Sequence, residues 1–181
     1  MIKLHDKSFK PYLTGNEIQG HIKQLASRIN ADYQNKLPLF IAVLNGSFMF
    51  ASDLLKNICV DCEISFVKLA SYQGTQSTGS VKTLIGQDVP MENRNIIIIE
   101  DIVDTGKTLY EFLPIIRSQN PASVEIASLL VKPGALKYDV NVKYRGLEIP
   151  NDFIVGYGLD YDGLGRNLND IYVINSTGNN D

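Results

Sequence analysis

The pattern of apolar and polar residues changes its period several times along the chain. After Thr14-Gly-Asn-Glu17, which has the spacing of a capping box, apolar residues recur at helical intervals as far as Tyr33. This pattern predicts an amphipathic helix over about residues 17–33. Leu39–Leu44 and Ile96–Ile99 are instead apolar throughout, as is typical of strands that are covered on both faces of a sheet.

Each of these two apolar strands runs into a glycine turn and then a helix, which is the first half of a β-α-β unit. One helix follows Asn45-Gly46-Ser47. The other begins at Gly106 and contains Pro114, which should kink the helix or cost about 3 kcal/mol. Further strands are predicted at about residues 59–69, 81–85, 124–131, 153–156 and 171–174, the second of them as the return arm of a long hairpin.

The alternation of strands and helices predicts the α/β class, with a parallel-sheet core flanked by helices. The pattern loosens over residues 132–150, and the polar, irregular C-terminal third predicts a small hood rather than another layer of sheet. A chain of 181 residues is near the usual size of one domain. We therefore expect a single domain over residues 1–181, with its core at about 14–131 and its hood mainly at 132–181 together with the N-terminal segment.

Composition and charge exclude several classes of protein. Apolar residues make up 44% of the chain, which excludes a disordered tail and a mini-protein held together by disulfides. With 17 basic and 20 acidic residues the net charge is −3, which argues against nucleic acid as a partner. The first residues lack the apolar region of a signal peptide, and no apolar run is long enough to span a membrane. We expect a cytoplasmic protein with no membrane partner.

Cys59 and Cys62 form a single C-x-x-C pair. A structural zinc site would need a second pair or two histidines within reach, and the chain has only His5 and His21. The flanking residues predict a strand, in which positions three apart face opposite sides, rather than the helix N-terminus that activates a thioredoxin-type thiol. We therefore expect two reduced, structural cysteines.

The residues that carry chemistry are concentrated where the strand at 96–99 ends, in the run Glu100-Asp101-Ile-Val-Asp104-Thr105-Gly106-Lys107-Thr108. Ligands of open α/β sheets bind at the carboxyl ends of the strands. The second half of the run suits a phosphate, because a glycine lets backbone N–H groups close around the anion and the helix start adds positive potential. The adjacent carboxylates suit the vicinal hydroxyls of a ribose. The run predicts a pocket for a ribose 5-phosphate; the plainer alternative is an acidic strand end before an ordinary helix cap.

The same run does not contain a P-loop. That motif needs a glycine five residues before Gly106, where the sequence has Asp101. Two adjacent carboxylates would also repel a polyphosphate unless a divalent cation lay between them. A P-loop kinase is therefore excluded.

The run at 96–108, IIIIEDIVDTGKT, resembles the phosphoribosyl pyrophosphate (PRPP) motif of the type I phosphoribosyltransferases, and most of all those that act on hypoxanthine and guanine. Further resemblances follow in order over about residues 38–175. Residues 44–47 resemble the pyrophosphate loop of the family, and 71–72 with 77–79 resemble its mobile loop. Residues 129–132 and 153–160, followed by Arg166, resemble its purine-binding part.

The resemblance implies a Mg²⁺-dependent enzyme of purine salvage, which transfers the 5-phosphoribosyl group of PRPP to N9 of hypoxanthine, and also of guanine. Asp104 would be the catalytic residue, as general base or acid at N7 of the purine. Glu100 and Asp101 would hold the ribose hydroxyls, directly or through Mg²⁺, and Asp160 would bind a second Mg²⁺ near pyrophosphate. The products would be IMP or GMP and pyrophosphate, and the enzyme would be a homodimer or homotetramer.

The other roles that the resemblance implies concern the phosphates and the purine. The 5′-phosphate would be bound by Thr105, Gly106, Lys107 and Thr108. Pyrophosphate would be bound by Arg166 and by the backbone of Leu44, Asn45 and Gly46, in a loop that often has a cis peptide in this family. The 6-oxopurine would be contacted by Lys132 at its oxo group, by Phe153 through ring stacking and by the backbone of Ile154. Ser71 and Tyr72 would belong to a lid.

Asn45 departs from the pattern of the family, because many relatives carry Lys or Arg at this position. Without that charge, pyrophosphate is left to backbone N–H groups, Mg²⁺ and Arg166. A charge-assisted hydrogen bond contributes about 1.5–3 kcal/mol. We therefore expect weaker pyrophosphate binding than in the relatives that carry lysine.

Several alternatives stay open at the level of the sequence. A regulatory protein could keep this fold to sense PRPP or a nucleotide while binding nucleic acid, but it should have a basic face, and the sequence offers none that is obvious. Among enzymes, xanthine or another 6-oxopurine could be the preferred substrate. Lys132 could be a solvated lysine at a strand end, Phe153 a core aromatic residue, and the loop at 71–80 a plain hairpin tip.

Overall fold

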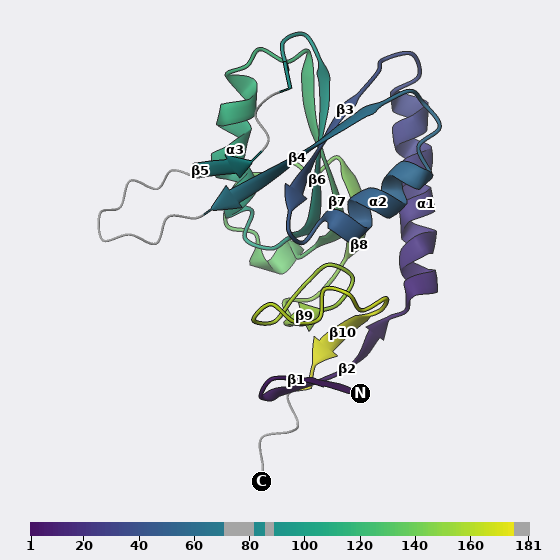
Figure 1. Cartoon of the computed structure of the whole chain (residues 1–181), viewed down its shortest axis with the longest axis vertical. Helices are drawn as coiled ribbons and strands as arrows, with labels where there is room; N and C mark the ends of the chain where they lie inside the picture. The colour runs from purple at the N-terminus through teal and green to yellow at the C-terminus, as the bar shows by residue number, and fades with distance from the viewer. Residues whose placement is uncertain (71–81, 86–88, 176–181) are drawn as a thin grey trace, which may run out of the picture.

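The computed structural model describes residues 1–70, 82–85 and 89–175, which form two sheets with helices around the larger one (Figure 1). The larger sheet has the strand order β5 (Lys82–Ile85), β4 (Glu63–Ala70), β3 (Leu39–Leu44), β6 (Asn95–Val103), β7 (Ser123–Val131) and β8 (Tyr144–Glu148). Strands β4, β3, β6, β7 and β8 run parallel, and β5 pairs antiparallel with β4. This topology confirms the predicted α/β class with a parallel core.

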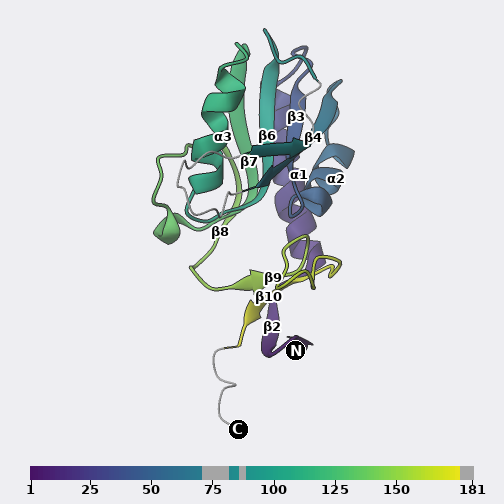
Figure 2. The same ribbon diagram turned by 60° about the vertical axis from the view of Figure 1, so that its left-hand side comes forward.

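Helices cover both faces of the larger sheet. They are α1 (Gly15–Asp32), α2 (Phe48–Lys56) and α3 (Lys107–Arg117), and a short 3₁₀ helix, η1 (Pro133–Ala135), follows β7. Figure 2 shows α1 and α2 on one side of the sheet and α3 on the other. Phe40 and Ile97 pack with α1 and α2, whereas their neighbours Ile41 and Ile98 pack with α3, and all four are fully buried. The uninterrupted apolar runs of β3 and β6 therefore contribute side chains to two hydrophobic cores, one on each face of the sheet.

The ends of the helices follow local sequence signals. The Thr14 hydroxyl accepts a hydrogen bond from the Glu17 N–H at 3.3 Å, and the Glu17 carboxylate accepts one from the Thr14 N–H at 2.8 Å. This is the predicted capping box, and α1 begins at Gly15, two residues before the predicted start. Pro114 lies on the exposed side of α3, and the helix ends three residues later at Arg117.

Three segments differ from the sequence-based expectation. Strand β4 begins at Glu63, so that Cys59 and Cys62 precede it in a connecting segment; both are free thiols. Strand β8 lies inside the stretch assigned mainly to the hood, yet it pairs with β7 and extends the core sheet. Its mixed sequence, YRGLE, alternates too weakly to mark a strand at a sheet edge. Strands β1 and β2, described next, were also not expected.

The hood is a small antiparallel sheet with the order β1 (Ile2–Leu4), β2 (Lys7–Leu13), β10 (Ile171–Ile174) and β9 (Ile154–Val155). It lies beyond the end of the larger sheet at which β3 terminates (Figure 1). The N-terminal hairpin and the C-terminal strands therefore share one sheet, in which Phe9 is fully buried. None of the helices in the described residues is long and apolar enough to cross a membrane.

Candidate functional site

The loop between β6 and α3 forms a small pocket of about 90 Å³. Gly106 has φ = +81°, in the left-handed region that favours glycine, and α3 begins at the next residue. The Lys107 N–H donates to the Thr105 hydroxyl at 3.3 Å, which stabilises the turn. The pocket is lined by Glu100, Asp104 and the four predicted phosphate-binding residues Thr105, Gly106, Lys107 and Thr108, among others. A glycine turn that opens a helix beside threonine hydroxyls is suited to a phosphate.

The two acidic residues at the end of β6 lie in an environment that disfavours negative charge. Burial raises the pKa of Glu100 well above its usual range, and the neighbouring charge of Asp101 raises it further. Burial also raises the pKa of Asp101 to about 6, although the Ile102 N–H, which donates to Asp101 at 2.8 Å, and Arg166 both lower it. The enclosed Oε2 atom of Glu100 has no hydrogen-bond partner. An unpartnered carboxylate oxygen at the pocket suits a hydroxyl donor or a cation.

A second pocket, of about 200 Å³, lies beside the phosphate loop and under the hood. It brings together predicted site residues that are far apart in the sequence: Gly46, Asp101, Asp104, Lys132, Phe153, Ile154, Asp160 and Arg166. Ile102 and Asp104 line this pocket as well as the phosphate pocket, so that the two are continuous along β6.

Lys132 and Phe153 occupy opposite kinds of environment in this second pocket. The Lys132 side chain is only 8% exposed, and its Nζ donates to the Asp104 carboxylate at 2.8 Å. Phe153 is 44% exposed. Lys132 is therefore not a solvated lysine at a strand end, and Phe153 is not a core residue. The arrangement gives the pocket a buried cation on one side and an accessible aromatic ring on another.

Phe153 is supported by residues that the sequence analysis did not single out. Its ring lies edge-on to Tyr161, with 5.8 Å between centroids, and 6.2 Å from Phe9 in the N-terminal hairpin. Tyr161 donates to Asp6 at 2.7 Å. Asp6 and Tyr161 are 155 positions apart. The pairing of β2 with β10 brings these distant segments together, so no local signal could have found this support.

The predicted pyrophosphate loop contacts Asp101 of β6, and its Gly46 lies against Gly158. The Leu44–Asn45 peptide is cis, as the resemblance implied. A Cβ atom at Gly46 would overlap the Asp101 carboxylate, so that any other residue there would have to displace this buried side chain. Across the pocket Arg166 forms an ion pair with Asp160 at 2.7 Å. The loop, the acidic strand end and the Arg166–Asp160 pair therefore border the same pocket.

The donor set fits a magnesium ion that is completed by substrate. Among the described residues, no three His, Cys, Asp or Glu side chains already converge as a metal cluster. Mg²⁺ is usually bound by one or two carboxylates together with water and substrate phosphates, so such a cluster is not required. The unpartnered Glu100 oxygen, the buried Asp101 and the nearby Asp160 are hard oxygen donors of the right kind.

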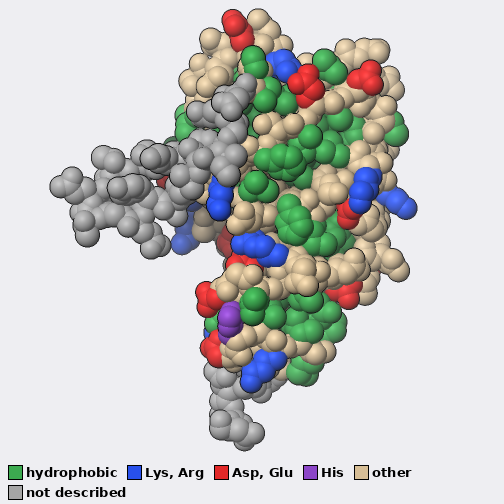
Figure 3. Space-filling view, in the orientation of Figure 1, with side chains coloured by type: hydrophobic (Ala, Val, Ile, Leu, Met, Phe, Trp, Pro, Cys, Tyr) green, Lys and Arg blue, Asp and Glu red, His purple; other side chains and the backbone are tan. Residues whose placement is uncertain are grey.

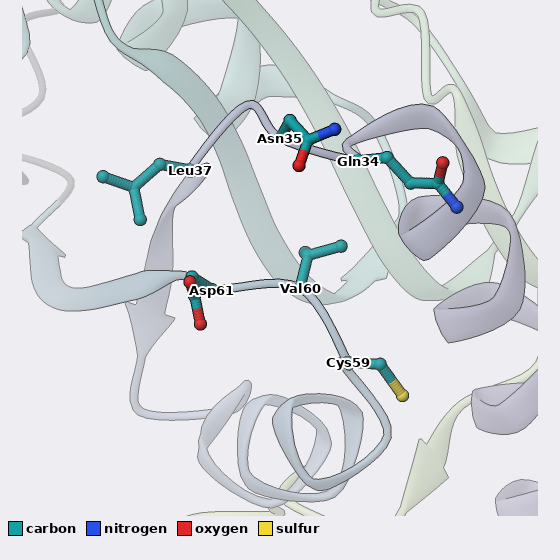
Figure 4. Close-up of a pocket in the computed structure, with 6 residues that line it drawn as sticks. All are labelled: Gln34, Asn35, Leu37, Cys59, Val60 and Asp61. Atoms are coloured by element: carbon teal, nitrogen blue, oxygen red, sulfur yellow. The ribbon is translucent and has the colours of Figure 1, made fainter.

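Another pocket of the described residues lies away from these groups. It has a volume of about 530 Å³ and lies between the segment after α1 and the segment before β4 (Figure 4). Its lining residues are Gln34, Asn35, Leu37, Cys59, Val60 and Asp61, and Asp61 is the only charged one. It is near the amino ends of β3 and β4, whereas ligands of parallel sheets bind at the carboxyl ends. The predicted lid residues Ser71 and Tyr72 lie outside the described residues.

Comparison with known proteins gives matches over nearly the whole chain. Residues 9–162 match the phosphoribosyl transferase domain. The hypoxanthine-guanine phosphoribosyltransferase of Staphylococcus aureus is 42% identical over 166 residues, which are 91% of this chain and 93% of the relative. A crystal structure of a hypoxanthine phosphoribosyltransferase from Staphylococcus aureus has a TM-score of 0.88 at 40% identity, covering 95% of this chain and 94% of that one. A hypoxanthine-guanine phosphoribosyltransferase structure from Bacillus anthracis has a TM-score of 0.87 at 36% identity, covering 94% and 100%.

Proposed function

Because the chain belongs to the phosphoribosyltransferase family, we propose that it transfers the 5-phosphoribosyl group of PRPP to N9 of hypoxanthine, and also of guanine. The observation that carries this proposal is the convergence of Asp104, Lys132, Phe153 and Arg166 on one pocket that adjoins the phosphate loop. These residues come from four separate segments of the chain, so it is the tertiary structure that brings them together. The products would be IMP or GMP and pyrophosphate, as purine salvage requires.

The ribosyl part of PRPP would lie along the end of β6. The pocket at residues 104–108 receives the 5′-phosphate, whose charge is matched by backbone N–H groups at the start of α3. Glu100 and Asp101 then accept hydrogen bonds from the ribose hydroxyls. Pyrophosphate is directed toward the backbone of 44–46 and toward Arg166; Gly46 and Arg166 border the second pocket.

The purine would lie between Phe153 and the Asp104–Lys132 pair. Stacking on the exposed face of Phe153 holds the ring plane. Lys132 donates to the 6-oxo group, and adenine is rejected because its 6-amino group cannot accept that hydrogen bond. The backbone of Ile154, which also lines this pocket, is placed to contact the edge of the ring.

In the transfer step the bond from C1′ to pyrophosphate breaks as the bond from N9 to C1′ forms. The purine thereby becomes more acidic at N7, and Asp104 accepts the proton that leaves this atom. C1′ develops cationic character, which the carboxyl oxygens of Glu100 and Asp101 stabilise. When bound, Mg²⁺ would neutralise the charge of the leaving pyrophosphate, and Glu100, Asp101 and Asp160 are the residues that would hold it.

A spectrophotometric assay tests this function. The protein is incubated with PRPP and Mg²⁺ together with hypoxanthine, guanine, xanthine, adenine or uracil in separate reactions. We expect turnover with hypoxanthine and guanine, and little or none with adenine and uracil. If none of the oxopurines is converted, the proposal is wrong. Preferential turnover of xanthine would keep the reaction type and change the substrate.

Homo-oligomeric assembly is also proposed. Figure 3 shows apolar side chains at the surface around α2 and β4. Phe48, Ile64 and Phe66 are between 37% and 42% exposed there. A second copy of the chain would cover such side chains, and light scattering during gel filtration measures whether the particle is a dimer or a tetramer. A cytoplasmic location stays a prediction from the sequence.

A further inference from the structure

A partly buried polar contact joins the hood to the core next to the pyrophosphate side of the pocket. The hydroxyl of Tyr157 donates to the carboxylate of Asp53 at 2.6 Å, and Gln19 donates to the same carboxylate oxygen at 2.6 Å. Tyr157 belongs to the hood and is only 1% exposed, Asp53 lies on α2, and Gln19 lies on α1. The other Asp53 oxygen accepts a hydrogen bond from Lys56 at 2.9 Å. One carboxylate therefore holds three separate segments together.

The backbone around Tyr157 has an unusual conformation, and the Tyr157 side chain lies in the core. Gly156, Tyr157 and Gly158 all have positive φ, at +100°, +51° and +99°. A residue other than glycine is uncommon in this region, so the tyrosine is present despite its local backbone preference. Its ring packs in the core formed with α1 and α2. The side chain of Tyr157 is thus an anchor for the turn that carries it.

The next residue, Gly158, is the point at which the hood touches the pyrophosphate loop. A Cβ atom at Gly158 would overlap the carbonyl oxygen of Gly46. The Gly158 carbonyl accepts a hydrogen bond from the Arg166 guanidinium at 2.8 Å, and the Gly158 N–H donates to the Arg166 carbonyl at 2.9 Å. Arg166 also pairs with Asp160 at 2.7 Å. The location of Gly158 therefore sets where Arg166 and Asp160 stand relative to Gly46.

We propose that Tyr157 and Asp53 are positioning residues for pyrophosphate: their hydrogen bond holds Gly158 against Gly46 and so fixes Arg166 and Asp160 opposite the 44–46 loop. The inference rests on the proposed function, in which those groups bind pyrophosphate. Neither residue lines the pocket, so each acts through the turn. A misplacement of binding groups by about 1 Å is enough to weaken an oriented reaction strongly.

The test is the variant Tyr157→Phe, which keeps the ring and removes the hydroxyl. Steady-state kinetics are measured forward with PRPP and hypoxanthine, and in reverse with IMP and pyrophosphate. We expect the KM for pyrophosphate and the KM for PRPP to rise by about fivefold, the effect of a typical lost hydrogen bond. The KM for hypoxanthine should stay within about twofold of the wild-type value, because the Phe153 and Lys132 contacts are separate.

A matched control separates positioning from stability alone. Tyr144 is also 1% exposed, and it donates to the carboxylate of Asp32 at 2.7 Å, in a contact between β8 and α1 away from the pocket. Tyr144→Phe removes an equivalent hydrogen bond. We expect it to lower the melting temperature while leaving all three KM values unchanged. If both variants raise the KM for pyrophosphate equally, or if Tyr157→Phe does not raise it, the positioning role is wrong.

Two further variants complete the experiment. Asp53→Asn replaces a charge-assisted hydrogen bond by a weaker neutral one, so it should raise the KM values for pyrophosphate and PRPP by a smaller factor, about twofold. A folded Asp53→Asn protein with unaltered KM values would contradict the proposal, even if Tyr157→Phe failed to fold.

Arg166→Gln removes the side chain assigned to pyrophosphate. If Arg166→Gln leaves the KM for pyrophosphate unchanged, the site assignment itself fails. If Arg166→Gln raises it and Tyr157→Phe does not, only the positioning role fails.

Discussion

Lys132 donates to Asp104 at 2.8 Å in the second pocket, so that the group proposed to recognise the oxo end of the base and the group proposed to accept its proton form an ion pair. The lysine is buried, whereas the Asp104 side chain is 48% exposed. In the proposed binding mode, a purine between them would replace this contact with its own oxygen and nitrogen atoms. The ion pair therefore holds both side chains in place and gives each a hydrogen-bond partner while no base is bound.

Replacing Lys132 by methionine should lower kcat/KM for hypoxanthine by about tenfold to a hundredfold, because a hydrogen bond from a charged donor contributes about 1.5–3 kcal/mol. The measurement is initial rate against hypoxanthine concentration at saturating PRPP. Lys143→Met is the matched control, since Lys143 also pairs with an aspartate, Asp32, at 3.1 Å but lies outside the pocket. Equal losses in both variants would show that Lys132 does not read the base.

Asp104→Asn should lower kcat by about a hundredfold or more, because the amide keeps a hydrogen-bond acceptor for Lys132 but cannot take a proton. Binding of PRPP should persist, since the residues of the 5′-phosphate loop are unaltered. Single-turnover kinetics give the rate of the transfer step, and calorimetric titration with PRPP gives the affinity. A variant that loses PRPP binding and turnover in parallel would assign Asp104 to binding rather than to proton transfer.

The local part of the site could be predicted from sequence because it is contiguous. Four of its residues lie within seven positions at the end of a buried strand: Glu100, Asp101, Asp104 and Gly106. The apolar run predicts this strand, and ligands bind at the carboxyl ends of such strands, so the location of the four residues could be predicted as well. The centre of the parallel core was predictable for the same reason, since β3 and the first part of β6 are uninterrupted apolar runs. Resemblance to a family, rather than pattern, added Lys132, Phe153 and Arg166.

The contacts that hold the hood in place could not be predicted, because they join residues far apart in the chain through single hydrogen bonds. Asp53 and Tyr157 are 104 positions apart. On α2 the sequence position of Asp53 is typical of a solvated helix residue, and nothing next to it indicates a partner in the hood. Strand β2 was missed because only Phe9 is fully buried along it, which leaves no alternation to detect.

Asn45→Lys should strengthen pyrophosphate binding. A lysine in the 44–46 loop would add a charged donor beside the pyrophosphate, worth about 1.5–3 kcal/mol, or about tenfold or more in affinity. The inhibition constant of pyrophosphate in the forward reaction measures this directly. Asn45→Gln is the control, because it lengthens the side chain without adding charge. An unchanged inhibition constant in Asn45→Lys would show that the position does not face pyrophosphate.

Asp53 should make the stability of the protein depend on pH. Burial opposes its ionisation, but hydrogen bonds from Tyr157, Lys56 and Gln19 outweigh burial and lower the pKa of Asp53 below its ordinary value of 3.8. A carboxyl with a lowered pKa stabilises the fold above its unfolded pKa and loses this contribution as the pH falls through the folded one. The advantage of wild type over Asp53→Asn in unfolding free energy should therefore be constant from pH 7 to pH 5 and shrink below about pH 4. Urea denaturation at these pH values measures it; an advantage that grows on acidification would contradict the assignment.

Gly158→Ala should destabilise the protein more than Gly163→Ala. Both glycines have positive φ, at +99° and +84°, so that alanine is strained by a similar amount, about 1–2 kcal/mol, at either position. Only at Gly158 does the added Cβ atom also overlap a neighbour, the carbonyl of Gly46, whereas nothing lies within 4 Å of it at Gly163. The unfolding free energies of the two variants in urea isolate the overlap, because the backbone strain largely cancels. Equal losses would mean that the hood and the 44–46 loop are not in contact in solution. A larger loss at Gly158, together with a raised KM for pyrophosphate, would show that this contact both holds the hood to the core and shapes the site.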